Sequence, residues 1–113
     1  MSSMTEHGEQ VTFVRWFRAT YPSVLLFAIP NGGKRDKGTA AKMREEGVTP
    51  GVPDLFIPAW KMFIEMKKEG GRLSKAQSEV IEYLRICGYT VEVCHGWREA
   101  AKKCVDKASA PAA

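Results

Sequence analysis

Two short apolar segments, at residues 54–58 and 61–67, are separated by only two residues, and this spacing restricts the fold more than any other feature of the chain. Segments of this length with so short a connection are typical of the two arms of an antiparallel β-hairpin. The connection at residues 59–60 lacks the Asn-Gly signal of the tightest turns. Counting back from a turn at that point, Asp54 lies opposite Glu65.

This register predicts that two acids and a lysine share one face of the sheet. Directly opposed residues of an antiparallel pair have Cβ atoms ~4.5–5.5 Å apart on the same face, so Asp54 and Glu65 would lie side by side. Lys67 is two residues beyond Glu65 and projects from the same face. Two neighbouring carboxylates repel each other unless a positive charge lies between them. A divalent cation meets this need, and carboxylate oxygens suit Mg²⁺ or Mn²⁺.

Two acids, a lysine and a divalent cation are the parts of a site that cleaves phosphodiester bonds. The cation neutralises charge that grows on the phosphate and supplies a water as the nucleophile. The ammonium group of Lys67 orients or polarises that water, or holds the phosphate. A second interpretation stays open, in which Asp54 and Glu65 only form ion pairs on a solvated hairpin. The local context supports the catalytic interpretation, because charges inside an apolar strand are costly unless they are used or paired.

The remaining segments indicate an α/β fold. Helical spacing and capping signals predict four helices, at about residues 5–20, 39–46, 75–87 and 97–107. A continuous apolar run predicts a buried strand at 23–29, and alternation predicts a last strand at 90–94. The element order is therefore roughly α-β-α-β-β-α-β-α, for which a mixed β-sheet flanked by helices is the natural packing.

Length and cysteine content indicate one ordinary domain. The 113 residues suffice for one hydrophobic core, and we expect a single domain over residues 1–107 with a disordered Ala/Ser/Pro tail at 108–113. The three cysteines, Cys87, Cys94 and Cys104, form no CxxC pair. Reduced thiols are expected, rather than a disulfide framework or a zinc ribbon.

Charge and hydropathy narrow the class of protein further. Residues 1–10 are polar, and no apolar run reaches the ~20 residues that span a bilayer. We therefore expect a cytoplasmic protein of a bacterial or phage-infected cell, neither secreted nor membrane-bound. The net charge of +4 permits a nucleic-acid partner without establishing one. Basic residues gather within 34–44 and 67–75, on both sides of the two acids.

Five short motifs occur in a recognisable order along residues 9 to about 95. They are Glu9, Asn31-Gly32, Gly51-Val52-Pro53-Asp54, Glu65-Met66-Lys67 and Ser74-Lys75-Ala76-Gln77. The order resembles the virus-type replication-repair nuclease (VRR-Nuc) branch of the PD-(D/E)xK nucleases. A proline-aspartate followed by Glu-x-Lys is a weak pattern by itself, whereas the ordered set of five is much more specific.

The resemblance implies a restriction-endonuclease-like fold and a metal-dependent endonuclease that acts on DNA. It implies that Asp54, Glu65 and the carbonyl group of Met66 hold Mg²⁺ or Mn²⁺, with no organic cofactor. It also implies that Lys67 is the catalytic lysine.

The resemblance adds two further site residues from the helices. Glu9 would reach in from the first helix as an additional acid and metal ligand, and Gln77 would approach from the helix after the catalytic strand. Each has a simpler interpretation that stays open. Glu9 suits the dipole of a first helical turn, and Gln77 suits the third helical position of a capping box that begins at Ser74.

Small members of this family resemble Holliday-junction resolvases, which implies a homodimer that acts on branched DNA. Basic and polar residues near the site are expected to contact DNA phosphates; they are Asn31, Lys34, Arg35, Lys37, Lys68, Arg72 and Lys75. For the basic segment 33–38, which includes Lys34, Arg35 and Lys37, a solvated loop is an equal interpretation, and the simpler interpretation of Asn31 is that it turns the chain. A non-catalytic DNA-binding module of the same fold, or a nuclease directed at RNA, are alternatives for the whole chain.

Overall fold

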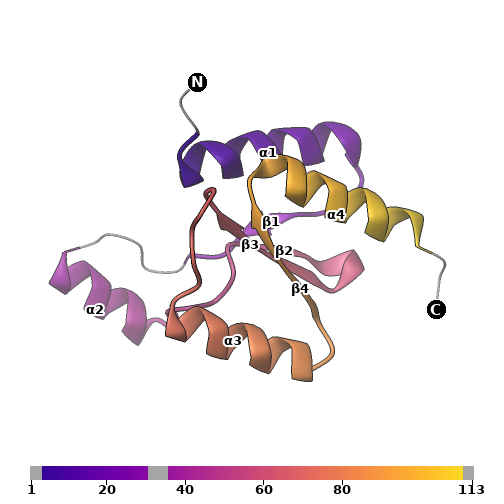
Figure 1. The fold of residues 1–113 in the computed structure, drawn as a ribbon. Coiled ribbons are helices and arrows are strands. Elements are labelled where there is room, and N and C mark those ends of the chain that lie inside the picture. Colours follow the sequence, from indigo (N-terminus) through magenta and orange to yellow (C-terminus); the bar gives the residue numbers. More distant parts are fainter. Residues whose placement is uncertain (1–3, 31–35, 111–113) are drawn as a thin grey trace.

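The computed structural model describes residues 4–30 and 36–110, which form a mixed four-stranded sheet with helices on both faces (Figure 1). The predicted fold class is confirmed. The elements are α1 (Glu6–Thr20), β1 (Phe27–Ala28), α2 (Lys37–Glu45), β2 (Leu55–Ile57), a 3₁₀ turn (Pro58–Trp60), β3 (Met62–Lys67), α3 (Lys75–Ile86), β4 (Thr90–His95) and α4 (Trp97–Ser109).

The strands follow the order β1-β2-β3-β4 across the sheet. The first three strands are antiparallel neighbours, and β4 runs parallel to β3. A parallel pair needs a long crossover, which α3 supplies. In the hairpin, Leu55 pairs with Ile64 and Ile57 pairs with Met62, so the predicted register is confirmed.

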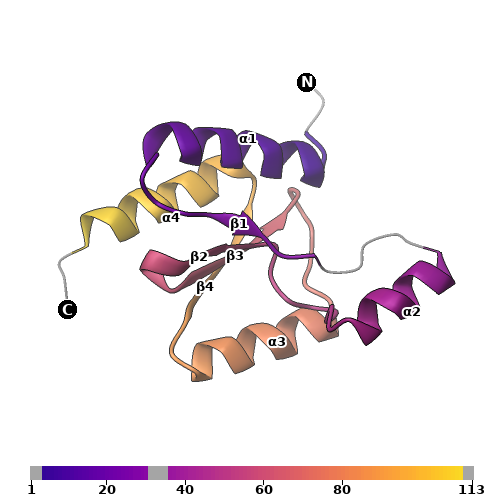
Figure 2. The same ribbon diagram turned by 180° about the vertical axis from the view of Figure 1, so that it is seen from behind.

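Helices cover the two faces of the sheet unequally. In Figures 1 and 2, α1 and α4 lie together on one face, and α3 lies on the opposite face. Both views show α2 standing away from the sheet, in agreement with its lack of buried residues. The better-covered face therefore holds most of the core.

The core lies between the sheet and the pair formed by α1 and α4. Its buried members come from every layer of that side: Phe13, Phe17, Leu26, Leu55, Ile57, Met62, Ile64, Met66, Cys94, Ala100 and Cys104. The buried residues of α4, which are Ala100, Ala101 and Cys104, are all small. All three cysteines are free thiols, as predicted.

The first strand differs from the prediction of a buried strand at 23–29. Only Phe27–Ala28 pairs, and β1 is an edge strand whose one neighbour is β2. Leu26 is buried, whereas Leu25 is 63% exposed and Phe27 is 40% exposed. Leu26 is thus the one buried residue of this run, and both residues of β1 are exposed, because an edge strand has a neighbouring strand on one side only.

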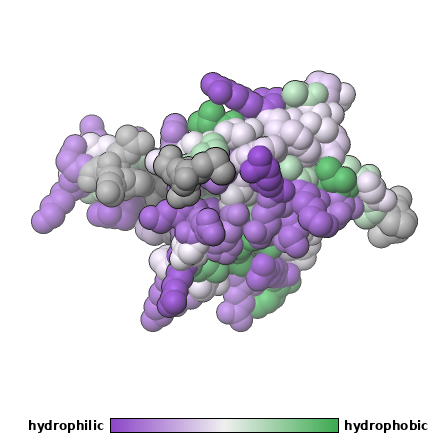
Figure 3. Space-filling model, turned by 45° about the horizontal axis from the view of Figure 1, so that its top comes forward, coloured by the Kyte–Doolittle hydropathy of each residue, from purple (hydrophilic) through white to green (hydrophobic). Residues whose placement is uncertain are grey.

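The outer surface of the α1 and α4 side is mainly polar. Figure 3, which brings this side forward, shows hydrophilic side chains over most of the view and apolar ones in small separate patches. Within residues 4–30 and 36–110, no helix has the length and hydropathy needed to cross a bilayer.

Gly51 lies directly against the first turn of α3. Its φ is +91°, and a Cβ atom at this position would lie 2.5 Å from the carbonyl oxygen of Ala76 and 3.0 Å from the backbone nitrogen of Gln77. Real Cβ atoms do not approach backbone this closely, so only glycine fits without a shift. The contact sets the start of α3 beside the segment that leads into Asp54.

We expect Gly51→Ala to destabilise the protein more than Gly47→Ala, which is a matched control. Gly47 also has a positive φ, of +102°, but a Cβ atom added there would meet nothing within 4 Å. Backbone strain alone should lower the free energy of unfolding of Gly47→Ala by about 1–2 kcal/mol. Overlap with α3 should cost Gly51→Ala roughly 1–3 kcal/mol more. Urea unfolding measures both, and equal losses would show that the contact with α3 has no role.

Candidate active site

Glu65 is buried at the centre of the sheet. It lies on β3 between β2 and β4, and it is 1% exposed. Its Oε2 atom accepts a hydrogen bond from Nε2 of Gln77 at 3.3 Å and lies 3.9 Å from Nζ of Lys67. Among the residues that the structure describes, Oε1 has no hydrogen-bond partner. Since a buried carboxylate oxygen is usually satisfied by a donor or a cation, Oε1 is available as a ligand for a cation.

Asp54 lies next to Glu65 at the start of the hairpin. Its Oδ2 atom accepts the backbone N–H of Met66 at 2.8 Å, and its carbonyl oxygen accepts the N–H of Ile29, also at 2.8 Å. The side chain thereby joins the start of β2 to the end of β3. These bonds explain why the acid holds a defined place although it lies just before the regular strand.

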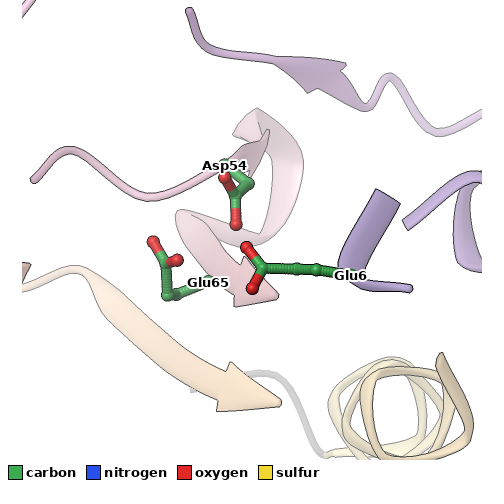
Figure 4. Close-up of side chains that lie close together, drawn as sticks. All are labelled: Glu6, Asp54 and Glu65. Carbon is green, nitrogen blue, oxygen red and sulfur yellow. The ribbon is translucent and has the colours of Figure 1, made fainter. Parts of the chain in front are cut away.

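A third acid, Glu6 of α1, joins this pair. Figure 4 shows the carboxylates of Glu6, Asp54 and Glu65 converging from α1, from the lead into β2 and from β3. One oxygen atom of each lies within 4.8 Å of the other two. Glu6 is exposed, Asp54 is half-buried and Glu65 is buried, so the group runs from solvent to the centre of the sheet. We call these three residues the acid cluster.

The acid cluster changes the protonation of Glu65. Burial, followed by the charge of Asp54, raises the pKa of Glu65 from its ordinary value of 4.5 to about 8, and Lys67 only partly opposes this rise. Without a cation, Glu65 therefore holds a proton at neutral pH. A cation that displaced this proton would relieve the repulsion among the acids.

The acid cluster fits a small divalent cation. Its donors are all carboxylate oxygens, which Mg²⁺ and Mn²⁺ prefer. Oxygen ligands of one Mg²⁺ ion lie about 3.0–4.2 Å from one another, given octahedral geometry and Mg–O distances of about 2.1 Å. The three carboxylate oxygens, which lie within 4.8 Å of one another, would have to move closer by up to about 2 Å to hold one such ion. The residues that would hold the ion are Glu6, Asp54 and Glu65, with the unpartnered Oε1 of Glu65 available as a ligand.

Gln77 both caps α3 and contacts Glu65. Ser74 and Gln77 form the predicted capping box: Oγ of Ser74 accepts the N–H of Gln77, and Oε1 of Gln77 accepts the N–H of Ser74. The amide nitrogen of the same side chain donates to Glu65. The cap therefore fixes the direction from which Gln77 reaches the acid cluster.

Glu9 lies outside the acid cluster. Its Oε1 atom accepts the backbone N–H of Trp97, the first residue of α4, at 3.0 Å. The acid that α1 does bring to the acid cluster, Glu6, was missed by sequence reasoning. Helical spacing does not single it out: Glu6 precedes the buried Phe13 by seven residues and Glu9 precedes it by four, so both acids lie on the face that continues the buried stripe of α1.

The structure describes four of the seven residues that are predicted to contact DNA. Lys68, Arg72 and Lys75 are exposed and follow β3 directly, close in sequence to Lys67. Lys37 is exposed at the start of α2. The predicted residues Asn31, Lys34 and Arg35 lie outside the described residues.

Comparisons of the sequence and of the structure with known proteins both identify the VRR-NUC domain family. The family model of the VRR-NUC domain matches residues 4–98. A solved structure named "VRR_NUC domain protein" superposes with a TM-score of 0.73 at 25% sequence identity, covering 92% of this chain and 88% of the other. No curated protein matches the chain.

We expect Mn²⁺ to stabilise the protein against heat. An ion that binds only the folded state at 100 times its dissociation constant adds about 2.7 kcal/mol. Because the ion must displace the proton of Glu65, its affinity should rise between pH 6 and pH 8. The midpoint of thermal unfolding, measured with Mn²⁺ and with EDTA at several pH values, reports both the stabilisation and its dependence on pH.

Glu65→Gln is the control for this prediction, because it keeps the shape and removes the charge. It should lose the stabilisation by Mn²⁺. In EDTA, wild-type stability should fall as pH rises from about 4.5 towards about 8, because the folded state keeps a proton that the unfolded chain has lost. The control should lack this slope. If Mn²⁺ raised the midpoint of thermal unfolding equally in the wild type and in Glu65→Gln, the ion would bind outside the acid cluster.

Proposed function

The chain belongs to the VRR-NUC domain family, and from this premise we propose that it is a metal-dependent endonuclease that hydrolyses phosphodiester bonds in DNA. Membership gives the chain a nuclease-type fold, and the acid cluster supports the metal-dependent chemistry. The observation that carries the proposal is the buried Glu65, whose Oε1 has no hydrogen-bond partner among the described residues, beside two further carboxylates.

The acids of this chain have the role of holding the ion. Asp54 and Glu65, with Glu6 from α1, supply carboxylate oxygens, and the carbonyl group of Met66 is a further candidate ligand. In a strand, the N–H and C=O groups of one residue face the same neighbour. Because the N–H of Met66 meets Asp54, its carbonyl is expected to face that side as well. When bound, the divalent ion activates a water and neutralises charge on the phosphate.

Lys67 is the proposed catalytic lysine. Its side chain is almost fully buried, and its ammonium group lies 3.9 Å from Glu65, so it is held at the acid cluster rather than free in solvent. A fixed ammonium group there orients the attacking water or contacts a phosphate oxygen as negative charge develops. Gln77 donates to the same oxygen of Glu65, Oε2, and so helps to keep that carboxylate in place.

Basic residues beyond the acid cluster are proposed to hold DNA phosphates. Lys68, Arg72 and Lys75 follow Lys67 in the loop and first turn that lead away from β3. Phosphate contacts of this kind fix the position of DNA without reading its sequence. The segment at 31–37 is proposed for the same role from its sequence.

A homodimer that cuts branched DNA is the proposed working form. The described residues of one chain form one acid cluster, and symmetric cutting of two strands needs two. A dimer with twofold symmetry is the commonest way to provide two identical sites. Light scattering at working concentration tests this part, and a monomer would contradict it.

We expect the wild type to cut a labelled four-way DNA junction with Mg²⁺ or Mn²⁺ and to be inactive in EDTA. Lys67→Ala should lower the cleavage rate by about 10²–10³-fold, because it removes one charge at the reacting phosphate. Binding of the junction should change little. Lys102→Ala is the matched control, because it removes a lysine from the exposed face of α4, where Lys102 pairs with Asp106.

The substrate panel decides between the proposed function and its alternatives. Selective cutting of the junction over linear duplex and single strands supports a junction nuclease. Binding of DNA without cutting in either metal ion would contradict catalysis and favour a binding module. Faster cutting of a matched RNA junction would contradict the choice of DNA.

A further inference from the structure

Helix α4 begins without a capping side chain of its own. Its N-cap residue is Gly96, which has a φ of +103° and no side chain to accept a hydrogen bond. The acceptor comes instead from α1, where Oε1 of Glu9 accepts the N–H of Trp97, 88 residues away in the sequence. A Cβ atom on Gly96 would lie 3.4 Å from Oε2 of Glu9, so the carboxylate fills the space that a side chain would occupy.

The same junction is bonded to the catalytic strand. The N–H of Gly96 donates to the carbonyl oxygen of Lys67 at 3.0 Å. Glu9 therefore links α1 to the start of α4, and the start of α4 is in turn hydrogen-bonded to β3, the strand that carries Glu65 and Lys67. This connection runs from helix to helix to strand without passing through the acid cluster.

The first turn of α1 is capped by Thr5, whose side chain accepts the N–H of Gly8, but no described residue of this helix before Phe13 is buried. The buried residues of this helix are Phe13 and Phe17, and Glu6 lies about two turns before the first of them. Helix ends fray readily when no tertiary contact holds them. Within the described residues, Glu9 lies between the buried part of α1 and Glu6, so its bond to α4 is placed to hold this end of the helix.

We propose that Glu9 is a positioning residue, whose hydrogen bond to the start of α4 holds the Glu6 carboxylate at the acid cluster. This role differs from that of a metal ligand, which the sequence suggested for Glu9. The inference rests on the proposed function, because it takes Glu6, Asp54 and Glu65 as the residues that hold a cation.

Three substitutions at this position separate the two roles. Glu9→Gln keeps a side-chain oxygen at the same reach and removes the charge. Glu9→Asp keeps the charge and shortens the reach by one methylene group, and Glu9→Ala removes both. A positioning residue must have a side chain long enough to contact the N–H of Trp97, whereas a metal ligand must keep its carboxylate. Glu6→Gln provides the comparison for loss of a ligand.

Calorimetric titration with Mn²⁺ is the first readout. We expect Glu6→Gln to bind at least about tenfold more weakly. Glu9→Gln should stay within about threefold of wild type, since a neutral acceptor still bonds Trp97, although less strongly than a charged one. Glu9→Asp and Glu9→Ala should each lose about tenfold. A loss in Glu9→Gln equal to that in Glu6→Gln would overturn the proposal and make Glu9 a ligand.

Amide hydrogen exchange in EDTA is the second readout and needs no bound ion. Two backbone amides report on the contact. The N–H of Trp97 donates to the side chain of Glu9, and the N–H of residue 9 donates to the carbonyl oxygen of Thr5 at the start of α1. Glu9→Asp and Glu9→Ala should speed exchange at both, and Glu9→Gln should not. Unchanged exchange in all three variants would overturn the proposal. If wild type bound no Mn²⁺, the proposed function would fail while this readout still tested the contact.

Discussion

Glu65 places a carboxyl group in the middle of a sheet, between β2 and β4, where almost no water reaches it. A charge in such surroundings is tolerated only when neighbouring groups replace the lost hydration. The neighbours come from different parts of the chain: Lys67 from the same strand, Gln77 from α3, and two acids that share the need for a cation. The fold has to bring each of these groups to the buried carboxyl group, which restricts how these elements can be arranged around it.

Local rules predicted the parts of the site that lie close together in the chain. Alternation along a strand has a period of two, so a turn of known length sets the register and places Asp54 opposite Glu65. The capping box of Ser74 and Gln77 is likewise a pattern within four residues. Short-range geometry therefore sufficed for the hairpin, for the start of α3 and for the order of elements.

Long-range packing determined what the sequence did not reveal. The run at 23–29 is apolar enough for a buried strand, but its place at the sheet edge leaves Leu25 and Phe27 exposed. Glu6 and Glu9 both lie near the start of α1 and look alike as helical acids. Their different surroundings depend on how α1 crosses the end of β3 and meets α4, which no local pattern encodes.

The bond between Glu9 and Trp97 also has a consequence for the order of assembly. Contacts between distant parts of a chain form late, because closing a long loop costs entropy before the contact returns any stability. During synthesis, α1 emerges before the other elements of this domain, and α4 emerges after every acid of the cluster. A nascent chain that ends before residue 97 would carry all three acids without the helix that α1 packs against. Assembly of the site is thus coupled to completion of the fold.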